Sequence, residues 1–262
     1  MSRMSVSHVS GVFFVAAVVM LAATGCSTGP VPFFEDNFDP DWEETQTSWR
    51  VATWTQNKTE MSPERCRTND DGMLVQTLLA GEPAKGGSMQ SSIEFPYGRW
   101  QARLKPSSVS GVCNTMFTDD WENMDTETPN DGTKFEVDIE LLTYTFGPGR
   151  GEVHLAVHCP EKSNAFVEDV ELDFNPSDAF HVWGFDILPD RIVWHVDGKI
   201  LRTFERPEGL TFNPGYEIFF NSRSQRSWIK GPNLEDAFYY IDWVRFWSMD
   251  QLDDLPPLLA RD

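Results

Sequence analysis

The chain has 262 residues, of which 24% are charged and 40% hydrophobic, so it can bury a sizeable core and is neither disordered nor a short disulfide-stapled module. One globular domain is expected. Its 41 acidic and 21 basic residues give a formal net charge of −20, which leaves no basic surface to neutralise phosphates and argues against nucleic acid or anionic lipid as a partner.

The N-terminus has the features of an export signal. Arg3 precedes an apolar run, Val12 to Ala23, that is shorter than the roughly 20 residues of a membrane-spanning helix. Small residues then precede Cys26, which resembles the bacterial lipobox, where the cysteine is acylated and becomes the new N-terminus. We expect a signal peptide over 1–25, lipidation of Cys26 with a spacer over 26–34, and an outer-membrane or cell-surface lipoprotein. A periplasmic or secreted protein with a free Cys26 is the alternative.

Three cysteines remain if Cys26 is modified. Cys66, Cys113 and Cys159 can form at most one disulfide in what is expected to be an oxidising compartment. The cysteines and histidines lack the spacing of a zinc site, so a structural zinc ion is not expected.

Hydrophobic and polar residues alternate with period two over many short segments, separated by Pro, Gly, Asn and Asp. The Asp197-Gly198 pair predicts a two-residue hairpin turn. So many strands in one unit predict an all-β fold of two stacked antiparallel sheets, a sandwich or jelly roll. The tail over 249–262 is acidic and broken by proline, and we expect it to be loose. The expected strands cover residues 72–79, 87–94, 97–105, 111–119, 135–143, 152–158, 166–174, 180–188, 191–196, 199–204, 217–222 and 238–248.

One predicted strand carries three alternating acids, Glu136, Asp138 and Glu140. On a strand they point to one face while the aliphatic residues between them enter the core. Like charges so close repel, so the bland interpretation is an acidic, solvated strand. The chemical interpretation is glycoside hydrolysis, in which two carboxyls about 5 to 5.5 Å apart support a retaining mechanism. That geometry requires a curved sheet, with the acids in a cleft on its concave face.

The sequence resembles glycoside hydrolase family 16, whose signature is E-x-D-x-E or, with a bulge, E-x-D-x-x-E. This chain has the unbulged spacing, similar to that of the bacterial lichenases (endo-β-1,3-1,4-glucanases). The resemblance implies a concanavalin-like β-jelly roll with a glycan cleft across its concave sheet. It also implies Glu136 as nucleophile, Asp138 as helper, Glu140 as general acid/base, Trp228 as a sugar-stacking residue and Asn221 as a cleft-lining residue. The matching segments are 97–106, Phe117-Thr118, 136–140, 180–186, 192–199, Asn221 and 241–245.

Several positions depart from the lichenase pattern. Lys134 stands where lichenases place a tryptophan before the nucleophile, and their Asn-x-Trp becomes Asn221-Ser222-Arg223. The strand after the acids carries His154, Ala156 and His158 at polar cleft positions. These changes remove sugar contacts and spare the three acids, so the chemistry is better supported than the substrate.

Other residues are secondary candidates. His154 and His158 share a strand face next to the acids and could bind sugar hydroxyls, add positive charge at low pH, or join the acids at a metal; we favour substrate contact. Phe117, Trp121 in the acidic loop over 119–131, and Lys134 are further candidate substrate contacts. Asp242 matches a calcium-holding position of lichenases, but one ligand is far short of the six to eight that calcium takes. We expect no required cofactor, with a structural calcium ion at Asp242 as the one metal that the resemblance implies.

Three functions are compatible with these residues. We favour a retaining, endo-acting hydrolase of a β-linked polysaccharide, with its catalytic domain over 35–248. The alternatives are a transglycosylase that remodels envelope glycans and a lipoprotein that binds glycans without cleaving them. In each case the partner is a polysaccharide, the chain is expected to be a monomer, and the membrane is reached only through the lipid anchor.

Overall fold

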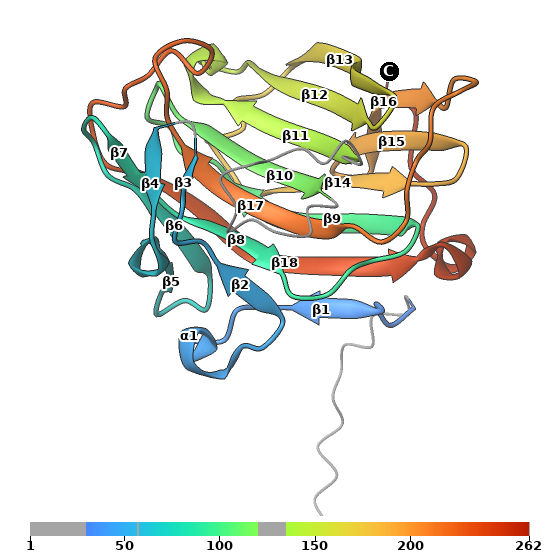
Figure 1. Cartoon of the computed structure of the whole chain (residues 1–262), viewed down its shortest axis with the longest axis horizontal. Coiled ribbons are helices and arrows are strands. Elements are labelled where there is room, and N and C mark those ends of the chain that lie inside the picture. The colour runs from blue at the N-terminus through green and yellow to red at the C-terminus, as the bar shows by residue number, and fades with distance from the viewer. Residues whose placement is uncertain (1–29, 57, 120–134, 262) are drawn as a thin grey trace, which may run out of the picture.

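The computed structural model describes residues 30–56, 58–119 and 135–261. Within this part of the chain, two large sheets form a sandwich with a small third sheet at one end (Figure 1). The predicted all-β jelly-roll sandwich is confirmed. No helix in the described residues is long and apolar enough to cross a membrane.

The seven-stranded sheet carries the three acids on a central strand. Every neighbouring pair of its strands is antiparallel. Its strand order is β13 (Lys162–Leu172), β12 (Gly151–Cys159), β11 (Glu136–Leu142), β10 (Cys113–Asp119), β17 (Glu217–Arg223), β8 (Ser88–Ser91) and β2 (Trp49–Val51).

The eight-stranded sheet packs behind it and closes the core. Its order is β16 (Lys199–Glu205), β15 (Arg191–Val196), β14 (His181–Ile187), β9 (Gly98–Lys105), β18 (Ala237–Ser248), β6 (Leu74–Leu78) and β5 (Cys66–Thr68), and β1 (Phe34–Asp36) also pairs with β18. The small sheet contains β3 (Thr55–Gln56), β4 (Thr59–Met61) and β7 (Ala84–Gly86). The short helices are α1 (Trp42–Thr45), η1 (Pro63–Arg65), η2 (Thr143–Thr145) and η3 (Met249–Asp254).

Each predicted strand has a counterpart, in β6 and in β8 to β18. The largest shift is in β13, which begins at Lys162 rather than at residue 166, because Cys159 pairs with Lys162 in a tight hairpin with β12. The turn at Asp197-Gly198 has positive φ at both residues, as predicted. The sequence did not predict strands β1 to β5 and β7. Each of them has only two or three residues, too few to show an alternation of hydrophobic and polar residues.

The C-terminal tail is not loose, so that expectation was wrong. Its first residues form η3, and Leu259 exchanges backbone hydrogen bonds of 2.8 Å with Gly198 and Ile200 at the edge of the eight-stranded sheet. Arg261 donates to the backbone oxygen of Glu171 at 2.6 Å. Backbone groups at a sheet edge make these contacts, and composition carries no information about them.

The core fixes the acid-bearing strand from behind. Val137, Ile139 and Leu141 are fully buried between the sheets, packed in one cluster with tryptophans of the other sheet. Trp194 reaches across from β15 and donates its indole N–H to the backbone oxygen of Asp138 at 3.0 Å. The strand is therefore held by packing and by a hydrogen bond on the side opposite its acids.

The cysteines add no crosslink in the described residues. Cys66, Cys113 and Cys159 are all buried and free. Cys26 and the predicted signal peptide lie outside the described residues.

Candidate active site

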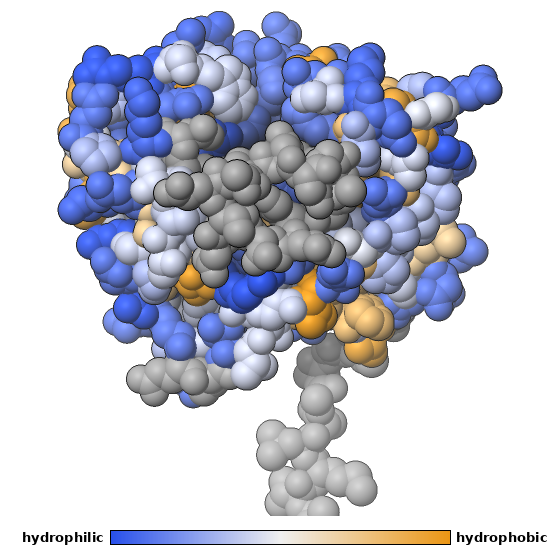
Figure 2. Space-filling model, in the orientation of Figure 1, coloured by the Kyte–Doolittle hydropathy of each residue, from blue (hydrophilic) through white to orange (hydrophobic). Residues whose placement is uncertain are grey.

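Glu136, Asp138 and Glu140 point away from the core on one face of β11, as the alternation predicts. Asp138 and Glu140 are only 3% and 8% exposed, whereas Glu136 is half-buried. The alternative interpretation, an acidic strand whose side chains are freely solvated, is therefore wrong. In the described part of the face shown in Figure 2, most residues are hydrophilic.

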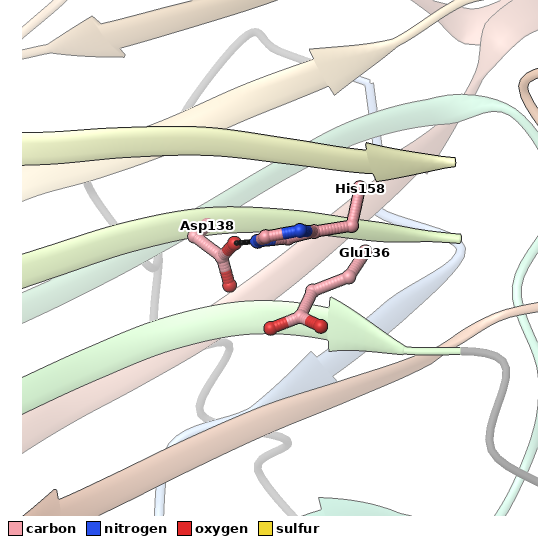
Figure 3. A group of neighbouring side chains, drawn as sticks. All are labelled: Glu136, Asp138 and His158. Carbon is pink, nitrogen blue, oxygen red and sulfur yellow. Dashed lines mark ion pairs between the residues drawn. The ribbon is translucent and has the colours of Figure 1, made fainter. Parts of the chain in front are cut away.

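Asp138 has a histidine partner from the neighbouring strand. His158 lies opposite Glu136 in the β11–β12 register, and its Nε2 is 3.5 Å from Asp138 Oδ2 (Figure 3). On the other side of the ring, the backbone N–H of Asn164 donates to His158 Nδ1 at 3.1 Å. Because Nδ1 accepts this bond, we assign the proton of the neutral ring to Nε2, which then donates toward Asp138.

The same three side chains could be mistaken for a metal site. Glu136, Asp138 and His158 each offer a ligand atom, and these atoms lie within 4.8 Å of one another. A metal at Nε2 would need the lone pair where the Asn164 contact places a proton. The arrangement therefore fits a hydrogen-bonded group rather than a cation site. At the other candidate position, Asp242 forms an ion pair with Arg103, and calcium there stays a prediction.

Glu140 lies in a closely packed polar environment. Arg223 Nη2 donates to Glu140 Oε1 at 2.7 Å, and Cys113 Sγ is 3.9 Å from the same oxygen. His154 Nε2 is 3.9 Å from the other oxygen, Oε2. Burial raises the pKa of Glu140 and the charge of Glu136 adds to this, while Arg223 and His154 oppose it; the net shift is upward. A carboxyl of this kind is suited to carry a proton near neutral pH.

His154 lies beside this carboxyl, and Trp228 packs against His154. The Nδ1 atom of His154 is 2.7 Å from Asp169 Oδ1, which orients the ring with Nε2 toward Glu140. Trp228 packs edge-on against His154 at a ring-centroid distance of 5.2 Å, and the guanidinium of Arg223 lies 5.4 Å from the Trp228 ring centre. The predicted sugar-stacking tryptophan therefore lies beside two residues that face Glu140.

Of the remaining candidates, Phe117 and Asn221 lie in the described part of the chain, and two others do not. Phe117 lies opposite Asp138 in the β10–β11 register and stacks on Phe219 at 4.8 Å. Asn221 is 1% exposed and its side-chain oxygen accepts from Thr115 at 2.8 Å, so it supports the floor of the site more than it offers this oxygen to a ligand. Trp121 and Lys134 lie outside the described residues.

Sequence reasoning missed three residues of the site as participants, Arg223, Cys113 and Asp169. In the sequence, Arg223 is a departure from the family pattern with no role assigned to it. Its place follows from register, because Arg223 pairs with Cys113 on β10, the strand between β17 and β11. Asp169 meets His154 through the β12–β13 register. No local sequence feature identifies such pairs.

Comparison with known proteins shows which family the chain is similar to. A model for the glycosyl hydrolases family 16 matches residues 35–245. A beta-glucanase of Bacillus subtilis (strain 168) is 26% identical over 197 residues, which cover 74% of this chain and 74% of that protein. A beta-glucanase of Bacillus licheniformis is 29% identical over 162 residues, which cover 61% of this chain and 62% of that protein.

Solved structures show the same fold. The Bacillus licheniformis beta-glucanase superposes with a TM-score of 0.67 at 21% identity, over 82% of this chain and 97% of that one. The laminarinase catalytic domain of Thermotoga maritima gives a TM-score of 0.69 at 18% identity, over 84% of this chain and 98% of that one. The sandwich is the fold of these neighbours, and the matching family model identifies the chain as a glycoside hydrolase. The chain belongs to glycosyl hydrolase family 16.

Proposed function

We propose that the protein is a retaining, endo-acting hydrolase of a neutral β-linked glucan. The observation that carries this is the set of three acids on one face of β11, in the unbulged spacing, with the pKa of Glu140 raised by burial. A raised pKa on one acid beside a second carboxylate divides the roles of acid and nucleophile between them.

The chemistry follows from these roles. Glu136 attacks the anomeric carbon, while Glu140 gives its proton to the glycosidic oxygen that leaves. The resulting glycosyl–enzyme ester is then hydrolysed by water, whose proton returns to Glu140. Asp138 lies between the two on the same face, and the Nε2–H group of His158 orients it.

The proposed substrate rests on charge and on the relatives. Three acids on one face, in a chain of net charge −20, repel an acidic polysaccharide and favour a neutral one. The curated relatives are named beta-glucanases and several of the structural neighbours are laminarinases, which supports a β-glucan.

The test measures reducing ends released from β-1,3-1,4-glucan, β-1,3-glucan and xyloglucan. Glu136→Gln and Glu140→Gln should each lose roughly 10² to 10⁴ in rate. Glu171→Gln, at an exposed acid of β13, is the matched control and should keep wild-type activity. Proton NMR of the first product should show the β-anomer, and product sizing should show internal cleavage. Equal rates in all four proteins would refute the proposal.

The same assay separates hydrolysis from the other two functions. Lengthened products in excess oligosaccharide acceptor would indicate transglycosylation. Glycan binding that survives Glu136→Gln, with no turnover in the wild type, would indicate a binding protein.

We also propose that the exported chain is anchored through a lipid on Cys26. The first described residue, Pro30, lies beside β18 of the eight-stranded sheet, where Trp247 donates to its backbone oxygen at 3.2 Å. The acids lie on the outer face of the other sheet, which supports a tethered domain whose site is open to polymer. Intact-mass measurement of the mature protein, with Cys26→Ala as control, tests the anchor; an unmodified Cys26 would refute it.

A further inference from the structure

Arg223 has surroundings unlike those of a residue that only binds substrate. It ends β17, its side chain is 10% exposed, and it donates from Nη2 to Glu140 Oε1 at 2.7 Å. Its guanidinium faces the ring of Trp228, and its Nε is buried with no hydrogen-bond partner among the described residues. A charged group so enclosed is fixed in orientation, and its one charge-assisted bond is directed at the carboxyl proposed as acid/base.

We propose that Arg223 is a positioning residue for Glu140: it holds Oε1, leaves Oε2 to carry the catalytic proton, and sets the upper pH limit of activity. This proposal rests on the proposed function, because it assigns Arg223 a part in the proton transfer of the same site.

The choice of oxygen follows from the contacts. A guanidinium only donates hydrogen bonds, so the oxygen that it contacts accepts and does not bear a proton. Oε1 contacts Arg223, while Oε2 lies on the His154 side at 3.9 Å. The acid form of Glu140 therefore carries its proton on Oε2. Without Arg223 the carboxyl could rotate about its last bond and present either oxygen.

The pH limit follows from the charges that surround Glu140. Among the described residues around Glu140, Arg223 on β17 bears the one positive charge that does not depend on pH. His154 on β12, backed by Asp169, is positive only when protonated, and Cys113 on β10 stays a neutral thiol because burial raises its pKa well above the ordinary value. Glu136 and Asp138 add negative charge from the same strand. Burial and these acids favour protonated Glu140, and the charge of Arg223 opposes them at every pH.

Substitution of Arg223 therefore has a defined direction. Arg223→Gln should raise the pKa of Glu140, so the basic limb of the kcat/KM profile moves to higher pH, by roughly 1 to 3 units as expected for loss of an adjacent arginine. Arg223→Lys keeps the charge and loses the planar fork, so its limb should move less. A merely structural role would lower rates and leave the limb in place.

A second readout tests the positioning of the proton. Oligosaccharides with a dinitrophenyl leaving group need little protonation, whereas those with a sugar leaving group need it fully. Arg223→Gln should lose about tenfold or more on the sugar leaving group, the scale of one charge-assisted hydrogen bond, and much less on the dinitrophenyl substrate. Equal losses on both substrates would overturn the positioning role.

The deciding measurement does not depend on activity. Carbon-13 NMR of glutamate carboxyls, with the Glu140 signal identified by its loss in Glu140→Gln, gives the Glu140 titration directly in wild type, Arg223→Gln and Arg223→Lys. An upward shift in Arg223→Gln supports the proposal, and an unmoved Glu140 titration overturns it. If the wild type proves inactive, the proposed function fails while this titration still decides the role of Arg223. If Arg223→Gln does not fold, Arg223→Met, which also removes the charge and keeps an unbranched apolar stem, decides by the same criterion.

Discussion

A buried ion pair in the eight-stranded sheet leads to a quantitative stability prediction. Arg99 on β9 donates to Asp186 on β14 through Nε at 2.6 Å and Nη2 at 2.7 Å. Their side chains are only 9% and 7% exposed, and the fully buried His195 lies 3.6 Å from Asp186. Asp186→Asn keeps the shape of the side chain but leaves the Arg99 charge buried without a counter-ion.

The cost of this change is large relative to the stability of a domain. Removal of one partner of a buried ion pair costs about 3 to 5 kcal/mol. Domains unfold with a free energy of about 5 to 15 kcal/mol, so roughly a fifth or more of the total stability is lost. At about 2 to 4 °C per kcal/mol for a domain of this size, Tm should fall by roughly 6 to 20 °C.

The effect also has a predicted pH dependence. Burial alone would raise the pKa of Asp186, but hydrogen bonds and charge from Arg99 and His195 outweigh it, and the pKa is lower than usual. A lowered folded-state pKa means that the pair contributes its full stability above the unfolded value of about 4 and loses it as the pH falls through the folded value. The difference between wild type and Asp186→Asn should therefore shrink in acid.

Urea unfolding at neutral and acidic pH measures both effects. Glu35→Gln is the matched control, because Glu35 accepts from Arg245 at 2.7 Å with both side chains about one third exposed. Exposed pairs contribute about 0 to 1 kcal/mol, so this variant should hardly change the free energy of unfolding. Equal losses in the two variants, or a difference that persists unchanged into acid, would refute the reasoning.

Three further predictions concern the site, the thiols and the tail. His158→Phe removes the hydrogen-bond donor to Asp138 and should lower kcat/KM by roughly 10- to 100-fold, the scale of a hydrogen bond to a charged group. The control His181→Phe breaks a histidine–carboxylate pair on the other sheet and should leave kcat/KM unchanged. Similar rates in the two variants would contradict this. Burial raises the pKa of Cys66 to about 12, that of Cys159 to about 11 and that of Cys113 well above the ordinary value. A thiol reagent at neutral pH should therefore modify these cysteines only after guanidinium has unfolded the protein. Rapid labelling of any of them in the native protein would be the contrary result. Removal of residues 256–262 deletes two backbone hydrogen bonds that together contribute about 2 kcal/mol. The Tm should fall by about 4 to 8 °C, and the activity should not change. An unaltered Tm would show that the tail adds no stability.

Period-two alternation predicted the larger strands because each has a buried face and an exposed or polar face. In β11, Val137 and Ile139 enter the core and the acids face outward, and this follows from the pattern alone. Alternation cannot predict β1 or β7, because each has only three residues and is defined by its pairing, β1 with β18 and β7 with β4. Nor could it detect the docking of Leu259, which depends on backbone atoms.

The site was predicted where it lies within one strand and missed where it depends on pairing between strands. Glu136, Asp138 and Glu140 are separated by one residue each, so their common face can be read from sequence. Arg223 and Glu140 are 83 positions apart and meet because β17, β10 and β11 are neighbours in a particular register. Register over such distances is set by the whole sheet and is not encoded in either segment.

The pairing also changes the meaning of the departures from the lichenase pattern. His154 and His158 are predicted to contact substrate, and Arg223 is a departure from the lichenase pattern; each of the three also lies within 4 Å of one of the acids. Three carboxylates on one strand face repel one another, and cations on both sides of β11 reduce that repulsion. Arg223 does so at all pH values and the histidines only when protonated, so the net charge of the site becomes less negative as the pH falls. These three residues are therefore close enough to the acids to influence their protonation, and the substrate contacts of His154 and His158 stay a prediction.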